Sequence, residues 1–583
     1  MHLATLDWIL IGSFFVVFLA IGWKVSKRSG QNTKEFFLSG QNMPWWLLGI
    51  SMVATTFSAD TPNLVTDIVR QNGISGNWVW WAFLLTGMLT VFVYARLWRR
   101  SEVVTDLEFY ELRYSGPEAA FLRGFRALYL GVFFNVMIMA AVCLAAIKIG
   151  GVLFDLEPWQ AVVYASVVTV IYSSFGGLRG VIFTDFLQFI VAMIGSVWAA
   201  YYIVNLPEVG GLDALLQHEN VASKLNFLPD FNDSSTLWTL LLIPIAVQWW
   251  SVWYPGAEPG GGGYVAQRML SAKNEQHAIG ATLLFNIAHY ALRPWPWILI
   301  ALASLVLYPE LSDIKNAFPN ATEGHDLGYS AMLTHLPPGL LGLVVTSLIA
   351  AFMSTISTHL NWGSSYIALD FYKRFVSPSS SEKRLVMVGR FSTVILMVLA
   401  ALLALLLEDA LSTFNILLQI GAGTGLIFIL RWFWWRINAY SEITGMAVSF
   451  VVALVFEIGD FGFDETTKLL TGVGITTASW IAATLLTKPT SAEQLSIFYN
   501  KITPYGSGWN GFKELSAAQG IKLNKTSESF SKDLLLFLLG VTLVYCALFG
   551  TGFLIYGNWL GSGVLLSIVV LCAFSMIRIY RNR

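Results

Sequence analysis

The side chains of this sequence that could do chemistry are hydroxyls and carboxylates placed inside long apolar stretches. One group lies in the stretch 44–70 and consists of Thr55, Thr56, Ser58, Asp60 and Thr61, followed by Pro62 and Asn63. A second group lies in the stretch 340–370 and consists of Ser354, Thr355, Ser357 and Thr358. Because hard cations are bound by hydroxyl, carboxylate and carbonyl oxygens, these groups predict a site for an ion such as Na⁺. The alternative interpretation of the second group is hydrogen bonding between closely packed membrane helices.

Two segments at membrane depth cannot continue as regular helix. A polar run that ends in Pro62 and Asn63 interrupts the stretch 44–70, and residues 255–263 hold Pro255, Pro259 and the glycines at 260–263. Non-helical backbone is tolerated in a bilayer only where it is buried in protein or lines a cavity. A pair of interrupted helices in two halves of a chain therefore predicts a secondary transporter that binds substrate and ions at the interruptions. The alternative for the second segment is a proline kink followed by a surface loop.

Three charged side chains, Asp60, Asp185 and Arg293, lie inside apolar stretches. Such charges are costly in a membrane and are functional hypotheses by default. The alternative for Asp185 is contact with water near the end of its stretch. The alternative for Arg293 is a structural ion pair with an acid such as Asp60. His289 and His359 are expected to be hydrogen-bonded core residues. No nucleophile, metal cluster or acid/base pair with suitable spacing indicates an enzyme.

The elements that must position these residues are membrane helices. Of the 583 residues, 56% are hydrophobic and 12% are charged, and the mean hydropathy is +0.63, a balance that soluble domains of this size do not have. About fifteen stretches have the length needed to cross a bilayer: 8–23, 44–70, 78–98, 127–154, 159–172, 181–204, 237–253, 278–306, 340–370, 385–407, 411–433, 443–456, 469–486, 534–555 and 560–579. We therefore predict an all-α polytopic membrane protein, in which the stretch 8–23 is a retained first helix and not a signal peptide.

The distribution of charge predicts the orientation, because Lys and Arg concentrate in cytoplasmic loops. With the N-terminus outside and the C-terminus in the cytoplasm, the inner loops hold most basic residues, among them Lys24, Arg28, Arg99, Arg100, Arg113, Arg123, Arg179, Arg268, Lys373, Arg374, Arg431 and Arg436. Residues 489–533 form the longest polar stretch and are expected to be a cytoplasmic loop. The net charge of -1 and the lack of a long basic tract argue against nucleic acid as a partner. Cys143, Cys546 and Cys572 lie in apolar spans and are expected to be packing residues.

Several segments resemble the sodium:solute symporter family, which includes the sodium/glucose, proline and sialic acid symporters. The most specific segment is 172–180, followed by Thr184, Asp185 and Gln188, which is similar to the family's Gly-Gly-Leu signature and its T-D-x-x-Q motif. Residues 264–268 and 354–361 resemble further family segments, and the likeness extends roughly over 6–447. The resemblance implies a transport core over 44–436, built as an inverted five-plus-five helix repeat with discontinuous helices. Residues 1–43 would add a leading helix and a loop, and residues 437–583 would add further membrane helices.

The same resemblance implies the residues that bind sodium. The family's shared sodium site maps onto the backbone carbonyls of Ala54, Phe57 and Ala351 and onto the hydroxyls of Ser354 and Thr355. A second sodium ion, which some members bind, would use Asp185, Ser357 and Thr358. Sodium is thus expected as a co-transported ion, with one or two ions per cycle.

The solute residues that the resemblance implies are Thr56, Ser58, Asp60, Thr61, Trp80, Arg293 and Gln419. Arg293 stands where sugar symporters have a lysine, and Gln419 stands where they have a solute-contacting glutamine. Trp80 replaces a polar side chain of the family and offers a flat apolar face of the kind that stacks on a sugar ring. The stretch 159–172 has no arginine where a sialic acid symporter binds its carboxylate, which counts against sialic acid itself. Residues 255–263 differ from the family pattern, so no contacts are assigned to them.

These observations predict a multi-pass protein of the cell membrane that imports a small polar solute together with sodium. The first expectation for the solute is a sugar or another polyhydroxylated compound. The alternative within this class is an organic anion or an amino acid whose carboxylate binds Arg293. The alternative from another class is a membrane sensor or channel. We expect the absence of a fused signalling module before Arg583 to count against this alternative.

Overall fold

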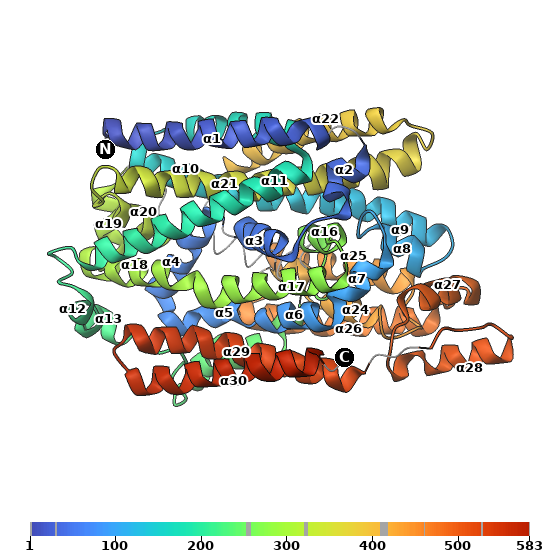
Figure 1. Cartoon of the computed structure of the whole chain (residues 1–583). Coiled ribbons are helices and arrows are strands. Elements are labelled where there is room, and N and C mark those ends of the chain that lie inside the picture. Colours follow the sequence, from blue (N-terminus) through green and yellow to red (C-terminus); the bar gives the residue numbers. More distant parts are fainter. Residues whose placement is uncertain are drawn as a thin grey trace.

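The computed structural model describes residues 3–29, 32–56, 58–251, 258–319, 324–407, 418–459, 461–525 and 529–581, and within them all side chains but those of 19, 22–29, 172 and 174–176. This part of the chain is helical, and the one isolated β-bridge described pairs Met43 with Ala272. The long helices run side by side along the molecule (Figure 1). The expected all-α architecture is confirmed.

Thirteen of the expected membrane spans appear as apolar helices. Within the described residues, ten are long enough to cross a membrane: Ile74–Ser101, Pro117–Phe154, Gly177–Val204, Glu275–Leu307, Leu340–Val376, Glu382–Ala404, Ala439–Ile458, Glu465–Leu486, Phe530–Ile555 and Trp559–Arg581. Three more are shorter: Thr5–Phe18, Trp45–Thr56 and Pro158–Ile171. Most of the predicted spans could be found from sequence because apolar length is a local property.

The two other expected spans differ from the prediction. In the described part of the stretch 237–253, α14 (Ser234–Leu237), the π-helix η5 (Trp238–Leu242) and α15 (Ile243–Ala246) follow one another directly, and the 3-10 helix η6 (Gln248–Trp250) comes after them. The side chain of Gln248 fixes this segment against the rest of the protein, because its amide donates to the backbone carbonyl of Val79 at 2.7 Å. The stretch 411–433 lies partly outside the described residues, and its described helix is α24 (Gly425–Leu430).

The first predicted interruption is present. Helix α3 (Trp45–Thr56) ends within the polar run, and α4 (Asp60–Asn72) starts within it. Pro62 stands in the first turn of α4, where its missing N–H costs nothing because the first turn of a helix has no intrahelical acceptor for it. The break therefore leaves the last carbonyls of α3 without helical partners in the middle of the protein.

The second interruption is seen in its described part, residues 258–262, before α16 (Gly263–Ser271) begins. Gly260 and Gly261 have φ angles of +89° and +85°, a region that favours glycine. Residues 252–257, which include Pro255 of the predicted interruption, lie outside the described residues. The tight backbone turn positions the N-terminus of α16 at the centre of the molecule.

A third change of direction occurs inside α11 (Pro158–Val204). This element contains the two expected spans 159–172 and 181–204, and Gly177 between them has φ 56°, which no regular helix contains. The Gly-Gly-Leu segment therefore joins two helices at a bend, and Asp185 lies two turns after it.

Helix α1 (Thr5–Ser29) packs against α11 and α21 (Leu340–Ser365), at the upper side of Figure 1. The buried carboxylate of Asp7 accepts hydrogen bonds from the backbone N–H groups of Gly339 and Gly342 at 2.6 and 2.8 Å. It caps the first turn of α21, the helix that carries the hydroxyl cluster. Helices α29 (Phe530–Ile555) and α30 (Trp559–Arg581) pair with each other along the opposite side.

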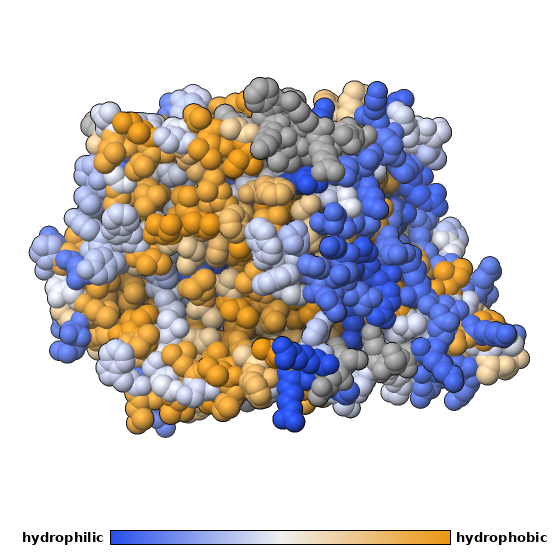
Figure 2. Space-filling model, viewed as in Figure 1, coloured by the Kyte–Doolittle hydropathy of each residue, from blue (hydrophilic) through white to orange (hydrophobic). Residues whose placement is uncertain are grey.

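Polar residues gather at one end of the molecule. Figure 2 shows an apolar zone over most of the face in view and a hydrophilic end beside it, where α2 (Thr33–Leu38), α8 (Glu108–Arg113) and α9 (Pro117–Leu128) lie in Figure 1. The ends of α1 and α30 nearest the chain termini lie towards opposite sides of this apolar zone.

The polar stretch 489–533 is more ordered than a simple loop. It contains α27 (Ala492–Ile502) and α28 (Asn510–Ala518), and α27 buries Leu495 and Phe498 against α8. Amphipathic periodicity within a polar segment was the signal for these helices.

Three arginines that the loop count places in cytoplasmic loops are buried in the protein. Arg113 and Arg268 are 0% exposed, and Arg431 is 3% exposed. Arg113 donates to the backbone carbonyls of Arg431 and Trp434 at 2.9 and 3.1 Å. These side chains therefore make contacts inside the protein. A count of charges along the sequence cannot tell such a buried arginine from one exposed in a loop.

Candidate functional site

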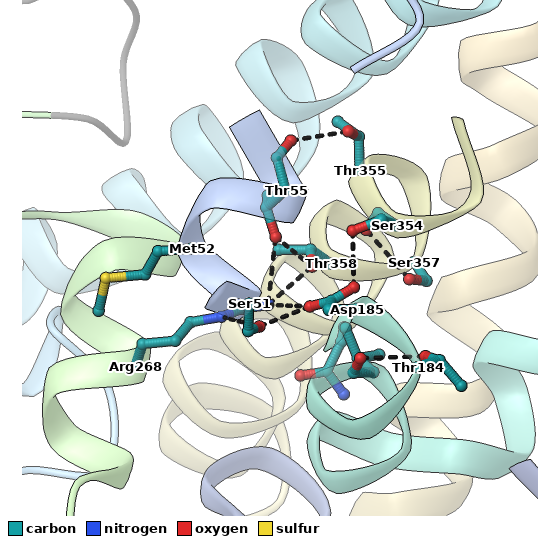
Figure 3. A network of polar contacts seen from close by, with 12 residues as sticks. Ser51, Met52, Thr55, Thr184, Asp185, Arg268, Ser354, Thr355, Ser357 and Thr358 are labelled. Carbon is teal, nitrogen blue, oxygen red and sulfur yellow. Dashed lines mark hydrogen bonds and ion pairs between the residues drawn. The ribbon is translucent and has the colours of Figure 1, made fainter. Parts of the chain in front are cut away.

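The centre of the molecule holds a connected network of polar side chains from α3, α11, α16 and α21 (Figure 3). Asp185 is its hub. One carboxylate oxygen accepts a hydrogen bond from Ser354 at 2.6 Å, and the other accepts one from Ser51 at 2.5 Å. Asp185 is 0% exposed, so the alternative that it contacts water is wrong.

Arg268 of α16 supplies the positive charge of this network. Its Nη2 lies 3.7 Å from a carboxylate oxygen of Asp185 and donates to the hydroxyl of Thr358 at 2.7 Å. Its Nε donates to Ser51 at 3.3 Å. Because both charged groups are fully buried, each depends on the other and on these hydroxyls for stabilisation.

The hydroxyls of α21 face the break between α3 and α4. Thr355 donates to the backbone carbonyl of Thr55 at 2.7 Å, one of the carbonyls that the end of α3 leaves free. Thr358 and Thr55 bond through their hydroxyls at 3.0 Å. Ala54 and Ala351, whose carbonyls were predicted as sodium ligands, are both 2% exposed. Phe57, the remaining residue of that predicted set, lies outside the described residues.

Side chains of the two predicted sodium sets are joined by a hydrogen bond. Ser354, assigned to the first set, bonds to Asp185, which was assigned to the second. Ser357 donates to the backbone carbonyl of Ser354 at 3.1 Å. Hydroxyls, free carbonyls and one carboxylate in a dry interior are the ligands that a small hard cation prefers.

A second cluster, of Thr56, Trp80, His289 and Arg293, lies on the other side of the break. The hydroxyl of Thr56 is 3.1 Å from Nδ1 of His289 and accepts a hydrogen bond from Arg293 at 3.4 Å. Arg293 also lies over the ring of Trp297, 5.4 Å from its centroid. The ring of Trp80 meets that of His289 edge to face at 5.8 Å and stacks on Tyr290 at 5.8 Å. This solute cluster combines hydrogen-bonding groups with flat aromatic faces.

The start of α4 adds further polar groups to the break. Thr61 donates to the carbonyl of Thr56 at 3.3 Å, and Ser58 is 6% exposed. One carboxylate oxygen of Asp60 and both amide atoms of Asn63 are buried without a hydrogen-bond partner among the described residues. Asp60 and Arg293 attract each other electrostatically, but the described contacts include no ion pair between them, so Arg293 does not form the predicted structural pair. Buried polar atoms without partners are rare and often mark a binding site.

A cavity of about 60 Å³ lies beside the solute cluster, between the 258–265 segment, Phe83–Thr90 and Thr282–Tyr290. His289, Tyr290, Tyr264 and Glu258 are among its lining residues. This volume accommodates a few water molecules and not a monosaccharide.

The comparison with known families decides the class of this protein. The sequence model of the sodium:solute symporter family matches residues 36–449, which is most of the chain. The chain belongs to the sodium:solute symporter family. This symporter is accordingly a transporter of the membrane and not an enzyme, and its family implies sodium coupling.

Similar proteins include sodium-coupled carriers of sugars and polyols. The symporter is 24% identical over 470 residues to a sodium/glucose cotransporter of Vibrio parahaemolyticus, covering 78% of this chain and 85% of that protein. It is 26% identical over 537 residues to a sodium/myo-inositol cotransporter 2 of Oryctolagus cuniculus, covering 83% and 77%. The solved structure of a Na⁺-coupled sialic acid symporter superimposes with a TM-score of 0.69 at 21% identity, covering 84% of this chain and 99% of that one. This last similarity shows a shared fold.

Gln419 of the symporter has a partner outside the solute cluster. Its amide donates to the carboxylate of Glu465 at 2.5 Å, on α26 (Glu465–Leu486). We expect Gln419→Ala to change the solute concentration for half-maximal uptake by less than about threefold, because the amide is already used in a contact between helices. Uptake measured over a range of solute concentrations checks this result. A loss of more than about tenfold would place Gln419 in the solute site instead.

Four residues of the symporter site were missed by sequence reasoning: Ser51, Glu258, Arg268 and His289. Arg268 was counted as a loop charge, and His289 was expected only as a bonded core residue. Both are indeed hydrogen-bonded, but their partners are site residues. The spacing of His289 and Arg293, one helical turn apart in an apolar stretch, was the available signal.

Proposed function

We propose that this protein is a sodium-driven importer of a sugar or another polyhydroxylated small solute. The observation that carries the proposal is the break between α3 and α4, where the free carbonyl of Thr55 meets the hydroxyl of Thr355. Oxygen ligands gathered around an interrupted helix can strip the water from Na⁺ at a small energetic cost.

Two sodium positions are proposed within the network. The first uses the carbonyls of Ala54, Phe57 and Ala351 with the hydroxyls of Ser354 and Thr355. The second uses Asp185, Ser357 and Thr358. The full burial of Asp185 and its bond to Ser354 support the second position, because a cation there would neutralise a carboxylate that lies away from water.

The solute cluster supports a hydroxyl-bearing ligand. Thr56, His289 and Arg293 can donate to or accept from hydroxyl groups, and Trp80 offers an aromatic face to the apolar side of a ring. The similarity to a glucose and a myo-inositol cotransporter supports the same solute class. The alternative solute is an organic anion, which the positive charge of Arg293 favours because Asp60 does not pair with it directly.

The proposed cycle is alternating access between the two sides of the membrane. The N-terminus lies outside and the C-terminus in the cytoplasm, an orientation that the charge pattern of the loops supports. Rocking of one five-helix repeat against the other would open the small central cavity first to one side and then to the other.

Uptake into proteoliposomes tests this function. With an inward sodium gradient, labelled glucose or myo-inositol is expected to accumulate at least about tenfold faster than with potassium in its place, because the ion network must be filled before the repeats move. A panel that adds an amino acid and a monocarboxylate identifies the solute class. Equal uptake in potassium for every solute would contradict sodium coupling.

A further inference from the structure

We infer that Arg268 is an internal counter-ion that exchanges with sodium at Asp185 and so allows the empty transporter to return across the membrane. The inference rests on the proposed function, because it concerns the second sodium position of that proposal. Arg268 is 0% exposed and lies in the network of Figure 3, where it reaches Asp185, Thr358 and Ser51. Sequence reasoning and the family resemblance assigned it no such role.

The contacts of Arg268 overlap with those of the proposed second ion. Thr358 accepts from Nη2 of Arg268 at 2.7 Å, and a sodium ion would need the same hydroxyl oxygen. The guanidinium also lies 3.7 Å from the carboxylate oxygen that Ser51 holds. Two positive charges cannot share this small dry space without strong repulsion. Asp185 is therefore neutralised either by sodium or by Arg268.

The three partners belong to elements that can move relative to one another. Asp185 lies on α11 and Thr358 on α21, which pack against each other. Arg268 lies on α16, which follows the irregular backbone at Gly260 and Gly261. Movement of α16 therefore changes the distance between Arg268 and Asp185 without breaking a regular helix. Cation occupancy and the position of α16 are coupled through this contact.

This exchange gives a physical reason for tight coupling. On the inward step, sodium neutralises Asp185 and Arg268 is displaced. After sodium leaves, Arg268 takes its place, so the empty protein does not carry an unpaired buried carboxylate through the closed conformation. Without Arg268, the empty protein could not return easily, whereas the loaded protein could still move in both directions.

Two transport modes separate these steps. Net uptake driven by a sodium gradient requires the return of the empty protein, whereas exchange of labelled for unlabelled solute, with sodium on both sides, does not. We expect Arg268→Gln to lower net uptake by at least about tenfold and to leave exchange within about threefold of the unchanged protein. Arg268→Lys, which keeps the charge, is expected to recover part of the net uptake.

Arg113→Gln is the matched control, because Arg113 is also 0% exposed but bonds to the backbone carbonyls of Arg431 and Trp434. It is expected to affect both modes in the same proportion. The double variant Asp185→Asn with Arg268→Gln removes both charges, and we expect it to restore net uptake above that of Arg268→Gln alone, with a weaker dependence on sodium.

The outcomes distinguish this inference from the proposed function. If the unchanged protein shows no sodium-dependent uptake, the proposed function fails. If it does, but Arg268→Gln lowers net uptake and exchange equally and the double variant gives no recovery, Arg268 is a structural residue and the inference is overturned. Unchanged transport in both modes overturns it as well.

Discussion

Removing the hydroxyls of Ser354 and Thr355 together is expected to raise the sodium concentration for half-maximal uptake by roughly thirtyfold, which corresponds to about 2 kcal/mol. Thr355 lies 2.7 Å from the carbonyl of Thr55 at the break, and Ser354 lies 2.6 Å from Asp185. The double change Ser354→Ala and Thr355→Ala therefore removes two ligands from the first proposed sodium position and a hydrogen bond from Asp185 of the second. Initial uptake rates over a range of sodium concentrations, at saturating solute, measure the effect.

The matched control for this change lies on the same helix. Ser364 and Ser365 are also buried, but their hydroxyls donate to the backbone carbonyls of Asn361 and Trp362 at 3.0 and 2.6 Å. The change Ser364→Ala with Ser365→Ala removes as many hydroxyls and is expected to leave the sodium dependence within about twofold. If both double variants respond to sodium like the unchanged protein, the ion does not bind at this break.

Replacing Arg293 by methionine is expected to lower solute uptake at least thirtyfold, or about 2 kcal/mol, because Arg293 supplies charge-assisted donors to the solute cluster. Its side chain is 2% exposed and lies between Thr56, His289 and the ring of Trp297. Sodium should still stabilise the Arg293→Met protein against heat, since the ion network does not include Arg293. Uptake and a thermal unfolding curve with and without sodium measure the two effects separately.

A second change at Arg293 identifies the solute class. Arg293→Gln keeps hydrogen-bond donors and removes the charge, so it is expected to retain more uptake of a neutral polyhydroxylated solute than Arg293→Met does. An organic anion would lose uptake equally in both variants. The control is Arg70→Gln, because Arg70 is also buried but bonds to Ser304 and to the carbonyl of Tyr308. Full uptake by Arg293→Met would exclude Arg293 from the solute site.

The sequence by itself determined the membrane class, most of the spans and the interruption between α3 and α4. These features are local: apolar length sets a crossing, and a polar run with Pro62 ends a helix wherever it is packed. The hydroxyl cluster of α21 was also visible, because four hydroxyls within five residues of an apolar stretch are unusual in any context.

Only the tertiary structure decided which of these residues meet. Arg268 and Asp185 are separated by more than eighty residues along the chain, and the bend at Gly177 with the break before Gly263 brings their helices together. In the same way, the side chain of Gln419 bonds to Glu465, and that of His289 bonds to Thr56. The direction of a side chain depends on how a helix is rotated against its neighbours, and that rotation is set by packing over the whole core, which no local pattern encodes.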